Sequence, residues 1–513
     1  MRLDLSPLDG FRGLLVTPYH TEYEAVRGLF NARIRTRPAL IARCADAGDV
    51  AAVVRFARDQ RLPIAVRGGG HNASGLSLVE GGVVIDVGGM REISFNPAID
   101  RAKDAKTANP TKTGQKANDA SNAGINDASN ADTADAGTAN ASTANAGTAE
   151  DGEIGTGSPT VTVGPGVGWR DIDLVTVPYG VVGPGGECPT VSNAGYSLGG
   201  GYGPLGRTFG LGCDHLERVE IVDADGRTLR VSEDEHADLF WALRGAGGAG
   251  FGVVTSLTYR LNPIPDTVIG GIVAWPLDRG REIFAAYRDL YADRADERLA
   301  LCLLLTTEPY PEGEPVIAMY GMYVGPPEEA HEHFAPVLSL GDPLFSSIGE
   351  TTYLDVMTVL GDEIVYGLQS KWLGGYFAED GFDEDAFAVL IEGFRRAPSG
   401  FSMVRFDLLA GGAVKRVPKD ATAFVHRDAL HYASIIAQWS GEEETEANVA
   451  WVDDFHEALR PHLTGEVYQN YADRELRDWA AAYYGANYPR LRQIKAKYDP
   501  QDVFHHPQSV RLP

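Results

Sequence analysis

The chain has 513 residues, of which 44% are hydrophobic, and a formal net charge of −26 from 71 acidic and 45 basic residues. This length can bury a large core and predicts two or more domains. An acidic surface repels phosphate backbones and anionic lipid, so nucleic acid and membranes are not expected as partners. No run of eighteen apolar residues and no signal-peptide pattern occur, so we expect a cytoplasmic protein without a membrane span.

The four cysteines, Cys44, Cys188, Cys213 and Cys302, are far apart and form no CxxC pair. This spacing argues against a disulfide scaffold and against a zinc site. No metal is therefore expected. The composition does not predict an oligomeric state.

The N-terminal third predicts alternating helix and strand. Apolar residues at helical spacing predict a helix, with Asp49 as its N-terminal cap, through Val50, Val53, Val54 and Ala57. The segments PIAV (63–66) and GVVIDV (82–87) predict short buried strands. The sequence RGGGHNASG between these strands places His71 in a turn.

Residues 98–159 consist mostly of Ala, Asn, Thr, Asp, Gly and Ser, in near-repeats such as GTANASTANAGTAEDG. Such a segment has almost no large apolar side chains to offset its chain entropy. We expect a disordered insertion in a surface loop, and an interaction tail is the alternative.

The rest of the chain predicts an α+β fold. A hairpin turning at Asp225–Gly226, an apolar helix (DLFWALRG) and a strand (FGVVTSLTYRL) complete a first domain at 1–261. Strand-like and helical stretches alternate through 262–455 and predict an antiparallel sheet backed by helices, a substrate domain. Residues 456–513 are expected to complete the first domain, with a last helix that Asp499–Pro500 stops.

The dinucleotide pattern GxGxxG occurs twice, beginning at Gly201 and at Gly245. A Rossmann loop requires a strand before the pattern and a helix after it. The first match contains Pro204 and is not followed by a helix, and the second follows a helix and precedes a strand. Neither match therefore predicts an NAD site.

Two other glycine-rich loops carry the candidate chemistry. The loop Arg67–Gly75 lets backbone N–H groups approach phosphate oxygens, although a tight turn alone would need the same residues. Cys188 lies in GGECPTV, between glycines and Pro189, whereas a lone cysteine is more often a buried apolar residue. Together the loops supply an imidazole, His71, and a thiol on backbone that can touch a flat ligand.

These two motifs resemble those of the berberine bridge enzyme-like oxidases, a branch of the vanillyl-alcohol oxidase superfamily. The resemblance extends to stretches such as DLFWALRGAGGAGFGVVTS and YYGANYPRLRQIKAKYDPQDVFHHPQSV. It implies a two-lobed FAD-binding domain. It also implies FAD bonded twice, by His71 at the 8α carbon and by Cys188 at carbon 6. Ser192 and Ala194 stand where members of the family more often carry glycine.

The resemblance implies further cofactor contacts in four segments of the chain. They are Arg67, Gly68, Gly69, Gly70, Asn72 and Gly75 in the first loop, Val191, Gly195 and Gly200 after Cys188, then Gly252 and Val254, and finally Tyr484 and Asn487.

The resemblance also suggests the reaction. In alcohol-oxidising relatives, the tyrosine of an Asn-Tyr pair accepts the hydroxyl proton of the substrate. Tyr471 is that tyrosine here, and the alternative is that it is only a packed tyrosine. A phenol titrates near pH 10, so this role needs a favourable environment. Gln438 is a candidate for orienting the substrate or an ordinary strand residue.

In this family the residue three positions after the cysteine controls the access of oxygen to the flavin, and a valine there permits it. Val191 occupies this position after Cys188. We therefore expect an oxidase that reduces O2 to hydrogen peroxide while oxidising a small alcohol, sugar hydroxyl or amine. A dehydrogenase with another acceptor and a flavin-binding protein without turnover are the alternatives.

Two histidine pairs suggest a site only superficially. His331 and His333 are two residues apart, so on a helix their side chains diverge. His505 and His506 are predicted to be exposed, and two adjacent histidines alone are too little to indicate a site.

Overall fold

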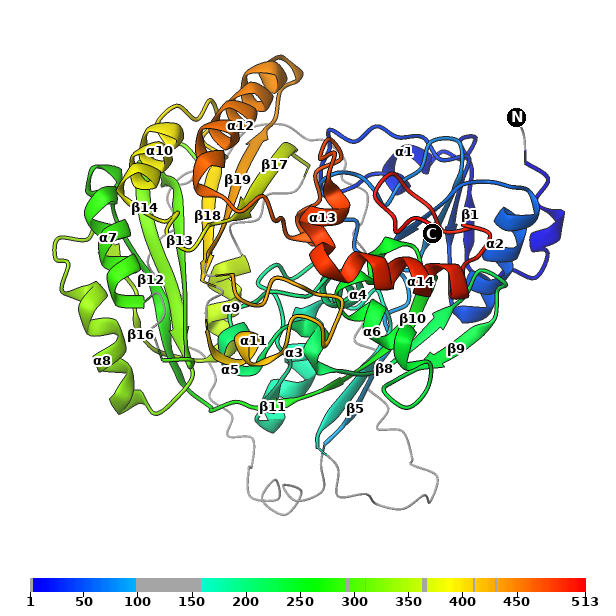
Figure 1. Ribbon diagram of the computed structural model, residues 1–513, viewed down its shortest axis with the longest axis horizontal. Coiled ribbons are helices and arrows are strands. Elements are labelled where there is room, and N and C mark those ends of the chain that lie inside the picture. Colours follow the sequence, from blue (N-terminus) through cyan, green and yellow to red (C-terminus); the bar gives the residue numbers. More distant parts are fainter. Residues whose placement is uncertain are drawn as a thin grey trace, which may run out of the picture.

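The computed structural model describes residues 3–97, 158–291, 296–309, 311–361, 367–408, 411–429 and 431–513. The insertion expected at 98–159 lies outside these residues except for its last two. Two halves, each built around its own sheets, lie side by side (Figure 1). No helix within the described ranges is long and apolar enough to cross a bilayer.

The chain begins with a four-stranded sheet in the order β1-β2-β4-β3. Strand β1 (Leu14–Val16) is antiparallel to β2 (Leu40–Arg43), whereas β4 (Val83–Asp86) runs parallel to β2 and to β3 (Ile64–Arg67). All four residues of β4 are buried, as expected for a parallel strand covered on both faces. The two strands predicted at 63–66 and 82–87 thus pair with each other.

Helix α2 (Ala47–Asp59) follows β2, and the four apolar residues predicted for its buried face are fully buried. Its N-cap is Asp46, whose side chain accepts hydrogen bonds from the backbone of Gly48 and Asp49. The prediction of Asp49 as the cap is wrong. The Asp49 carboxylate instead accepts from the backbone N–H groups of Arg12, Gly13 and Ala45, which fixes the preceding chain.

A five-stranded antiparallel sheet completes the first half. Its order is β5 (Ile93–Asn96), β6 (Thr160–Val163), β10 (Val253–Arg260), β8 (Leu216–Val222) and β9 (Thr228–Val231). The predicted β8–β9 hairpin is present, with the N–H of Gly226 bonded to the carbonyl of Asp223. A two-stranded pair joins β7 (Val181–Val182) and β11 (Asn262–Pro263).

The second half contains an eight-stranded antiparallel sheet, as predicted. The order is β15 (Phe345–Ser346), β12 (Val268–Pro276), β14 (Glu314–Tyr323), β13 (Leu299–Glu308), β18 (Met403–Leu408), β19 (His431–Trp439) and β17 (Gln369–Tyr376), with β16 (Gly349–Thr351) also on β12.

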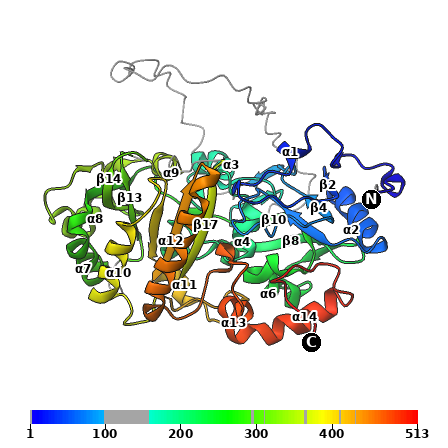
Figure 2. The same cartoon turned by 90° about the horizontal axis from the view of Figure 1, so that it is seen from above.

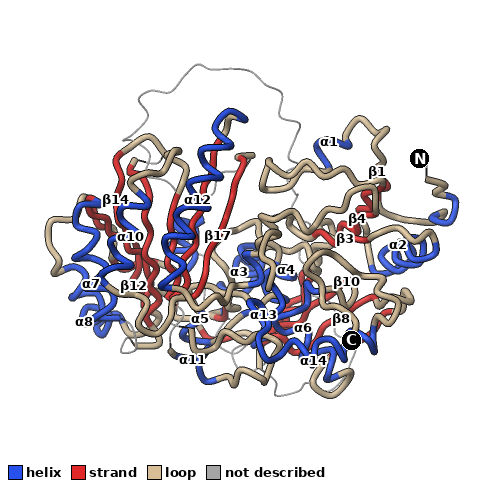
Figure 3. Tube along the Cα trace, turned by 45° about the horizontal axis from the view of Figure 1, so that its top comes forward, coloured by secondary structure: helices blue, strands red, loops and turns tan. Residues whose placement is uncertain are grey.

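Four helices cover the face of this sheet that points away from the first half (Figures 1 and 3). They are α7 (Gly280–Tyr291), α8 (Pro327–Leu338), α10 (Glu384–Phe394) and α12 (Thr445–Leu459). Because strand side chains alternate between faces, Leu301, Leu303 and Leu305 join the helix-backed core, whereas Cys302 and Leu304 point to the opposite face. This second face looks toward the first half of the molecule.

The C-terminal segment returns to the first half, where α13 (Trp479–Tyr484) and α14 (Tyr488–Tyr498) lie near α6 (Figure 2). The remaining helices within the described ranges are α1 (Tyr23–Val26), α3 (Trp169–Thr176), α4 (Asn193–Leu198), α5 (Gly206–Phe209), α6 (Ala237–Ala246), α9 (Tyr353–Gly361) and α11 (Gly412–Arg416). Helix α14 ends where Asp499–Pro500 was predicted to stop it.

A buried ion pair joins the two halves. The guanidinium of Arg427, 1% exposed, donates to both oxygens of Asp214 at 2.7 and 2.8 Å and to Oγ1 of Thr422 at 2.8 Å. Burial alone would raise the pKa of Asp214, but the hydrogen bonds and charge of Arg427 lower it below its ordinary value. Asp214 is therefore ionised at neutral pH and depends on this partner.

Replacing Arg427 with methionine should destabilise the protein by about 3–5 kcal/mol, because it leaves the Asp214 charge buried and unpaired. The measurement is the thermal or urea unfolding midpoint. The control is Arg460→Met, which removes the exposed pair of Arg460 with Glu457 and should leave the midpoint unchanged. Equal midpoints for the two variants would contradict the assignment.

Candidate functional site

A cavity of about 470 Å³ lies between the two halves, within the range of about 300–1,000 Å³ typical of ligand sites. Its walls come from the loop after β3, the loop before α4, the inner face of the eight-stranded sheet and the C-terminal segment. A smaller pocket of about 50 Å³ adjoins it and shares Glu187, Tyr202, Tyr320, Arg405 and Tyr471 with it. The predicted site residues therefore meet at the junction of the two halves.

Two glycine-rich loops touch each other at one wall of the cavity. A Cβ on Gly68 would lie 2.5 Å from Oγ of Ser192, and one on Gly69 would lie 2.8 Å from the carbonyl oxygen of Thr190. The N–H of Gly69 donates to Oγ of Ser192 at 3.1 Å. Glycine is thus required at Gly69 by close approach of backbone to backbone, and a side chain there would push the loops apart.

This contact brings His71 and Cys188 to the same cavity. Nε2 of His71 lies 2.9 Å from Oγ1 of Thr190, and Sγ of Cys188 lies 3.5 Å from the same oxygen. The His71 ring stacks on Phe30, with centroids 4.8 Å apart and planes 22° apart. Burial lowers the pKa of His71 to about 4, so at neutral pH its imidazole is uncharged and has one nitrogen lone pair available as a nucleophile.

Most of the predicted site residues line the cavity. The lining includes Gly68, Gly69, Gly70, His71, Asn72, Cys188, Val191, Gly195, Gly252, Val254, Gln438, Tyr471 and Tyr484. Gln438 is 4% exposed and lies on β19, where Ser434, Ile436 and Gln438 share the cavity face. Cys44, Cys213 and Cys302 are buried and do not line this cavity, although Cys302 lines the smaller pocket. Burial raises the pKa of all three thiols.

Four predicted contact residues do not line the cavity. Arg67, the last residue of β3, forms a buried ion pair with Asp86, its register partner on β4, at 2.6 Å. The amide of Asn487 donates to the backbone carbonyls of Lys419, Thr422 and Ala423.

The other two are glycines with positive φ, +72° at Gly75 and +124° at Gly200, where an added Cβ would meet Ile34 and Phe424 respectively. All four residues shape the chain around the cavity, and their contact with a cofactor stays a prediction.

Several other residues line the cavity although the sequence did not predict them as part of the site. His505 and His506 line the cavity, and Nε2 of His506 lies 3.1 Å from the carbonyl of Gly248; His505 is exposed, as predicted. Burial lowers the pKa of His506 to about 4. The run Gly245–Gly250 also lines this cavity, although it is not a Rossmann loop. Its high content of glycine was the feature of the sequence that could have indicated a ligand site.

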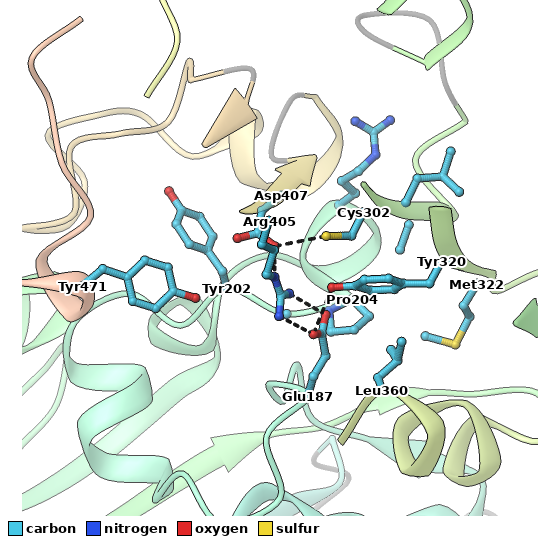
Figure 4. A pocket seen from close by; sticks show the side chains of 15 residues that line it. Glu187, Tyr202, Pro204, Cys302, Tyr320, Met322, Leu360, Arg405, Asp407 and Tyr471 are labelled. Atoms are coloured by element: carbon cyan, nitrogen blue, oxygen red, sulfur yellow. Dashed lines mark hydrogen bonds and ion pairs between the residues drawn. The ribbon is translucent and has the colours of Figure 1, made fainter. Parts of the chain in front are cut away.

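A buried charged cluster at the smaller pocket was also missed (Figure 4). The guanidinium of Arg405 on β18 forms two bonds to Glu187, at 2.6 and 2.8 Å, and one to Asp407 at 2.9 Å. The hydroxyl of Tyr320 donates to Glu187 at 3.2 Å. Burial raises the pKa of Glu187, which Arg405 opposes. Glu187 immediately precedes Cys188, so this pair ties the cysteine loop to the eight-stranded sheet.

Tyr471 ends a short 3-10 helix, Gln469–Tyr471, and points into the same pocket (Figure 4). Its ring packs against Trp372, Tyr432 and Tyr468. Burial raises its pKa well above the ordinary phenol value, Asp407 adds to this, and Arg405 acts in the opposite direction. The phenol therefore keeps its proton at neutral pH in the free site.

No group of three or more His, Cys, Asp or Glu side chains within the described ranges could hold a metal ion. The cavity suits a large planar cofactor better. Its walls combine glycine backbone, the uncharged His71 ring and aromatic side chains, and a Cβ on Gly248 would meet nothing within 4 Å. Long, partly apolar cavities with a few polar groups are typical of cofactor sites.

Comparisons with known proteins agree with this geometry. The family model described as "FAD binding domain" matches residues 38–158 and 151–232, and the one described as "Berberine and berberine like" matches residues 467–511. The uncharacterised FAD-linked oxidoreductase YgaK of Bacillus subtilis is 30% identical over 97% of this chain and 96% of its own length. The (R)-6-hydroxynicotine oxidase of Paenarthrobacter nicotinovorans is 25% identical over 96% of both chains.

Solved structures share the fold. The BBE-like 1 protein of Physcomitrella patens superposes with a TM-score of 0.79 at 24% identity, covering 99% of this chain and 98% of its own. The 6-hydroxy-D-nicotine oxidase of Arthrobacter nicotinovorans gives 0.78 at 23% identity, covering 100% and 99%. The predicted α+β fold class is confirmed.

Replacing Gly69 with alanine should lower the FAD bound per chain by several fold. The added Cβ would collide with backbone atoms of Thr190 and Ser192, which cannot rotate away. The control is Gly89→Ala, whose Cβ would meet its nearest atom only at 3.9 Å. The measurement is the flavin-to-protein absorbance ratio of each purified variant. Full flavin content in Gly69→Ala would show that the loop contact is dispensable.

Proposed function

The chain belongs to the berberine bridge enzyme-like family of FAD-linked oxidoreductases, and we propose that it is an oxidase with FAD bonded to both His71 and Cys188. It oxidises a small alcohol, sugar hydroxyl or amine and passes the electrons to O2, which becomes hydrogen peroxide. The observation that carries the proposal is the convergence of the imidazole and the thiol on one cavity, both in contact with the Thr190 hydroxyl.

The residues of the first half and the C-terminal segment would hold the cofactor, and those of the eight-stranded sheet would hold the substrate. We accordingly assign 1–261 with 456–513 to the FAD unit and 262–455 to the substrate unit, although helix α12 crosses this boundary and its last turn packs with the substrate unit. When bound, FAD accepts two electrons from the substrate and delivers them to oxygen. The part played by this chain is to orient the substrate, to remove its proton and to keep water from the reacting atoms.

Tyr471 is our candidate for the group that takes the substrate proton. It lies in the pocket between the cysteine loop and the sheet, and Gln438 lies on the cavity face of β19, where its amide can orient a hydroxyl or amine. Because burial raises the Tyr471 pKa, the base form is scarce at neutral pH. The neighbouring guanidinium of Arg405 is the group that favours the phenolate, so proton removal depends on that charge.

Oxygen is the favoured acceptor because Val191 lines the cavity beside Cys188, leaving room that a longer side chain would fill. A dehydrogenase with another acceptor is the alternative. Relatives are named as oxidases of 6-hydroxynicotine, aclacinomycin and xylooligosaccharide. A panel of amines, alcohols and sugars, assayed for peroxide release and for bleaching of the flavin without oxygen, separates oxidase, dehydrogenase and inert flavoprotein.

Acid-precipitated wild-type protein should remain yellow, because covalently bonded FAD survives unfolding. His71→Ala and Cys188→Ala should each retain covalent colour through the remaining bond, and the double variant should release all of its flavin. Cys44→Ala, which alters a buried cysteine that does not line the cavity, is the control and should keep both bonds. Free FAD from the acid-treated wild type would refute double attachment.

Tyr471→Phe should slow reduction of the flavin by substrate by about 10²–10⁴-fold, the usual contribution of general-base catalysis. The phenyl ring keeps the packing but cannot accept a proton. Wild-type reduction should also accelerate as pH rises from neutral to alkaline, because the Tyr471 pKa lies above neutrality and the phenolate fraction grows as the pH approaches it, and Phe should abolish this rise. Stopped-flow absorbance measures reduction and reoxidation separately, and reoxidation should be unchanged. If Tyr471→Phe is reduced at the wild-type rate, Tyr471 is not the base, and Asp407 and Glu187 become the candidates.

A further inference from the structure

The hydroxyl of Thr190 lies between the two nucleophiles. Its Oγ1 is 2.9 Å from Nε2 of His71 and 3.5 Å from Sγ of Cys188. His71 and Cys188 line the cavity, but Thr190 does not and is exposed to solvent. Thr190 therefore contacts both nucleophiles without itself being part of the cavity lining.

The hydrogen bond to Thr190 can decide which nitrogen of His71 is nucleophilic. An uncharged imidazole carries a proton on one nitrogen and a lone pair on the other. When Oγ1 accepts a hydrogen bond from Nε2, the lone pair is on Nδ1. Stacking on Phe30 fixes the plane of the ring, so the Thr190 contact and the stack together set both the direction and the tautomer of this side chain.

The same hydroxyl can serve Cys188. A threonine hydroxyl donates one hydrogen bond and accepts others, so Oγ1 can accept from Nε2 of His71 while its own proton is donated to Sγ. This direction stabilises the thiolate, which is the nucleophilic form of cysteine. The reverse direction would leave a proton on both the sulfur and Nδ1. Only the first arrangement presents two nucleophiles to the cavity at once.

We propose that Thr190 is a positioning residue for flavin attachment, which orders the protons so that Nδ1 of His71 and Sγ of Cys188 are both nucleophilic. The inference rests on the double attachment proposed above. In each attachment a C–N or C–S bond replaces one C–H bond of the flavin. The two electrons and two protons released, one proton from carbon and one from the side chain, reduce molecular oxygen to hydrogen peroxide.

The exposure of Thr190 fits this role. Bonding through Nδ1 leaves a positive imidazole until the Nε2 proton departs, and Oγ1 connects that proton to bulk water. Exposure also sets the size of the effect, because water competes for the same hydrogen bonds. The loss of the hydroxyl should slow attachment severalfold rather than abolish it.

The test compares Thr190→Val, which keeps the shape but lacks the hydroxyl, with Thr190→Ser, which keeps the hydroxyl. Both substitutions are made in the full chain and also in the Cys188→Ala and His71→Ala backgrounds, which isolate each bond. Samples are purified at fixed times after induction in air. Total flavin is measured by absorbance, covalent flavin by acid precipitation, and the linked nitrogen by NMR of the isolated flavopeptide.

We expect Thr190→Val to contain as much total flavin as the wild type but about threefold to tenfold less covalent flavin at early times. Thr190→Ser should match the wild type, and the wild-type histidine bond should run through Nδ1. The proposal is overturned by equal covalent fractions in Val and wild type, by a bond through Nε2, or by equal losses in Val and Ser. A wild type without covalent flavin would overturn the double attachment itself, and Thr190 would have no such role.

Discussion

The contact between the two glycine-rich loops is the constraint on which the rest of the site depends. At Gly69 the backbone approaches Thr190 so closely that no Cβ fits, and this contact joins the loop that follows the parallel strand β3 to the loop that precedes α4. His71 and Cys188 reach one cavity only because these loops meet there. The sheets behind the loops have a rigid, fully buried core, so the distance between the two nucleophiles is set by the fold.

A second constraint comes from buried charge. The pair of Arg405 with Glu187 fastens the cysteine loop to β18 across the cavity. Taking two charges out of water costs more than their attraction commonly returns, so such a pair is better understood as fixing geometry than as adding stability. It also places a permanent positive charge and two carboxylates beside Tyr471. If Tyr471 is the base as proposed, the substrate must fit these charges, and the cluster would then act in substrate selection as well as in loop position.

Local patterns in the sequence predicted much of the fold. Helical spacing found α2, alternation and turn residues found the β8–β9 hairpin, and the alternating strands and helices of the second half predicted its helix-backed sheet. The glycine motifs found His71 and Cys188. The contacts that the sequence did not predict are those that long-range pairing decides. Arg67 stands beside the glycine loop in sequence, yet strand register sets it opposite Asp86. Arg405 and Glu187 carry no local signal of their pairing, and His506 reaches the cavity only because the C-terminal segment folds back.

Burial has opposite consequences for the two titratable groups that matter most. It lowers the pKa of His71, so the imidazole is uncharged and nucleophilic at neutral pH. It raises the pKa of Tyr471, so the phenol keeps its proton. The same desolvation that favours the proposed bond to the cofactor therefore works against Tyr471 as the proposed base. The positive charge of Arg405 is the nearby group that opposes this effect, and it is held in place by Glu187, the residue next to Cys188. The proposed cofactor attachment and the proposed proton removal would thereby be linked through one loop.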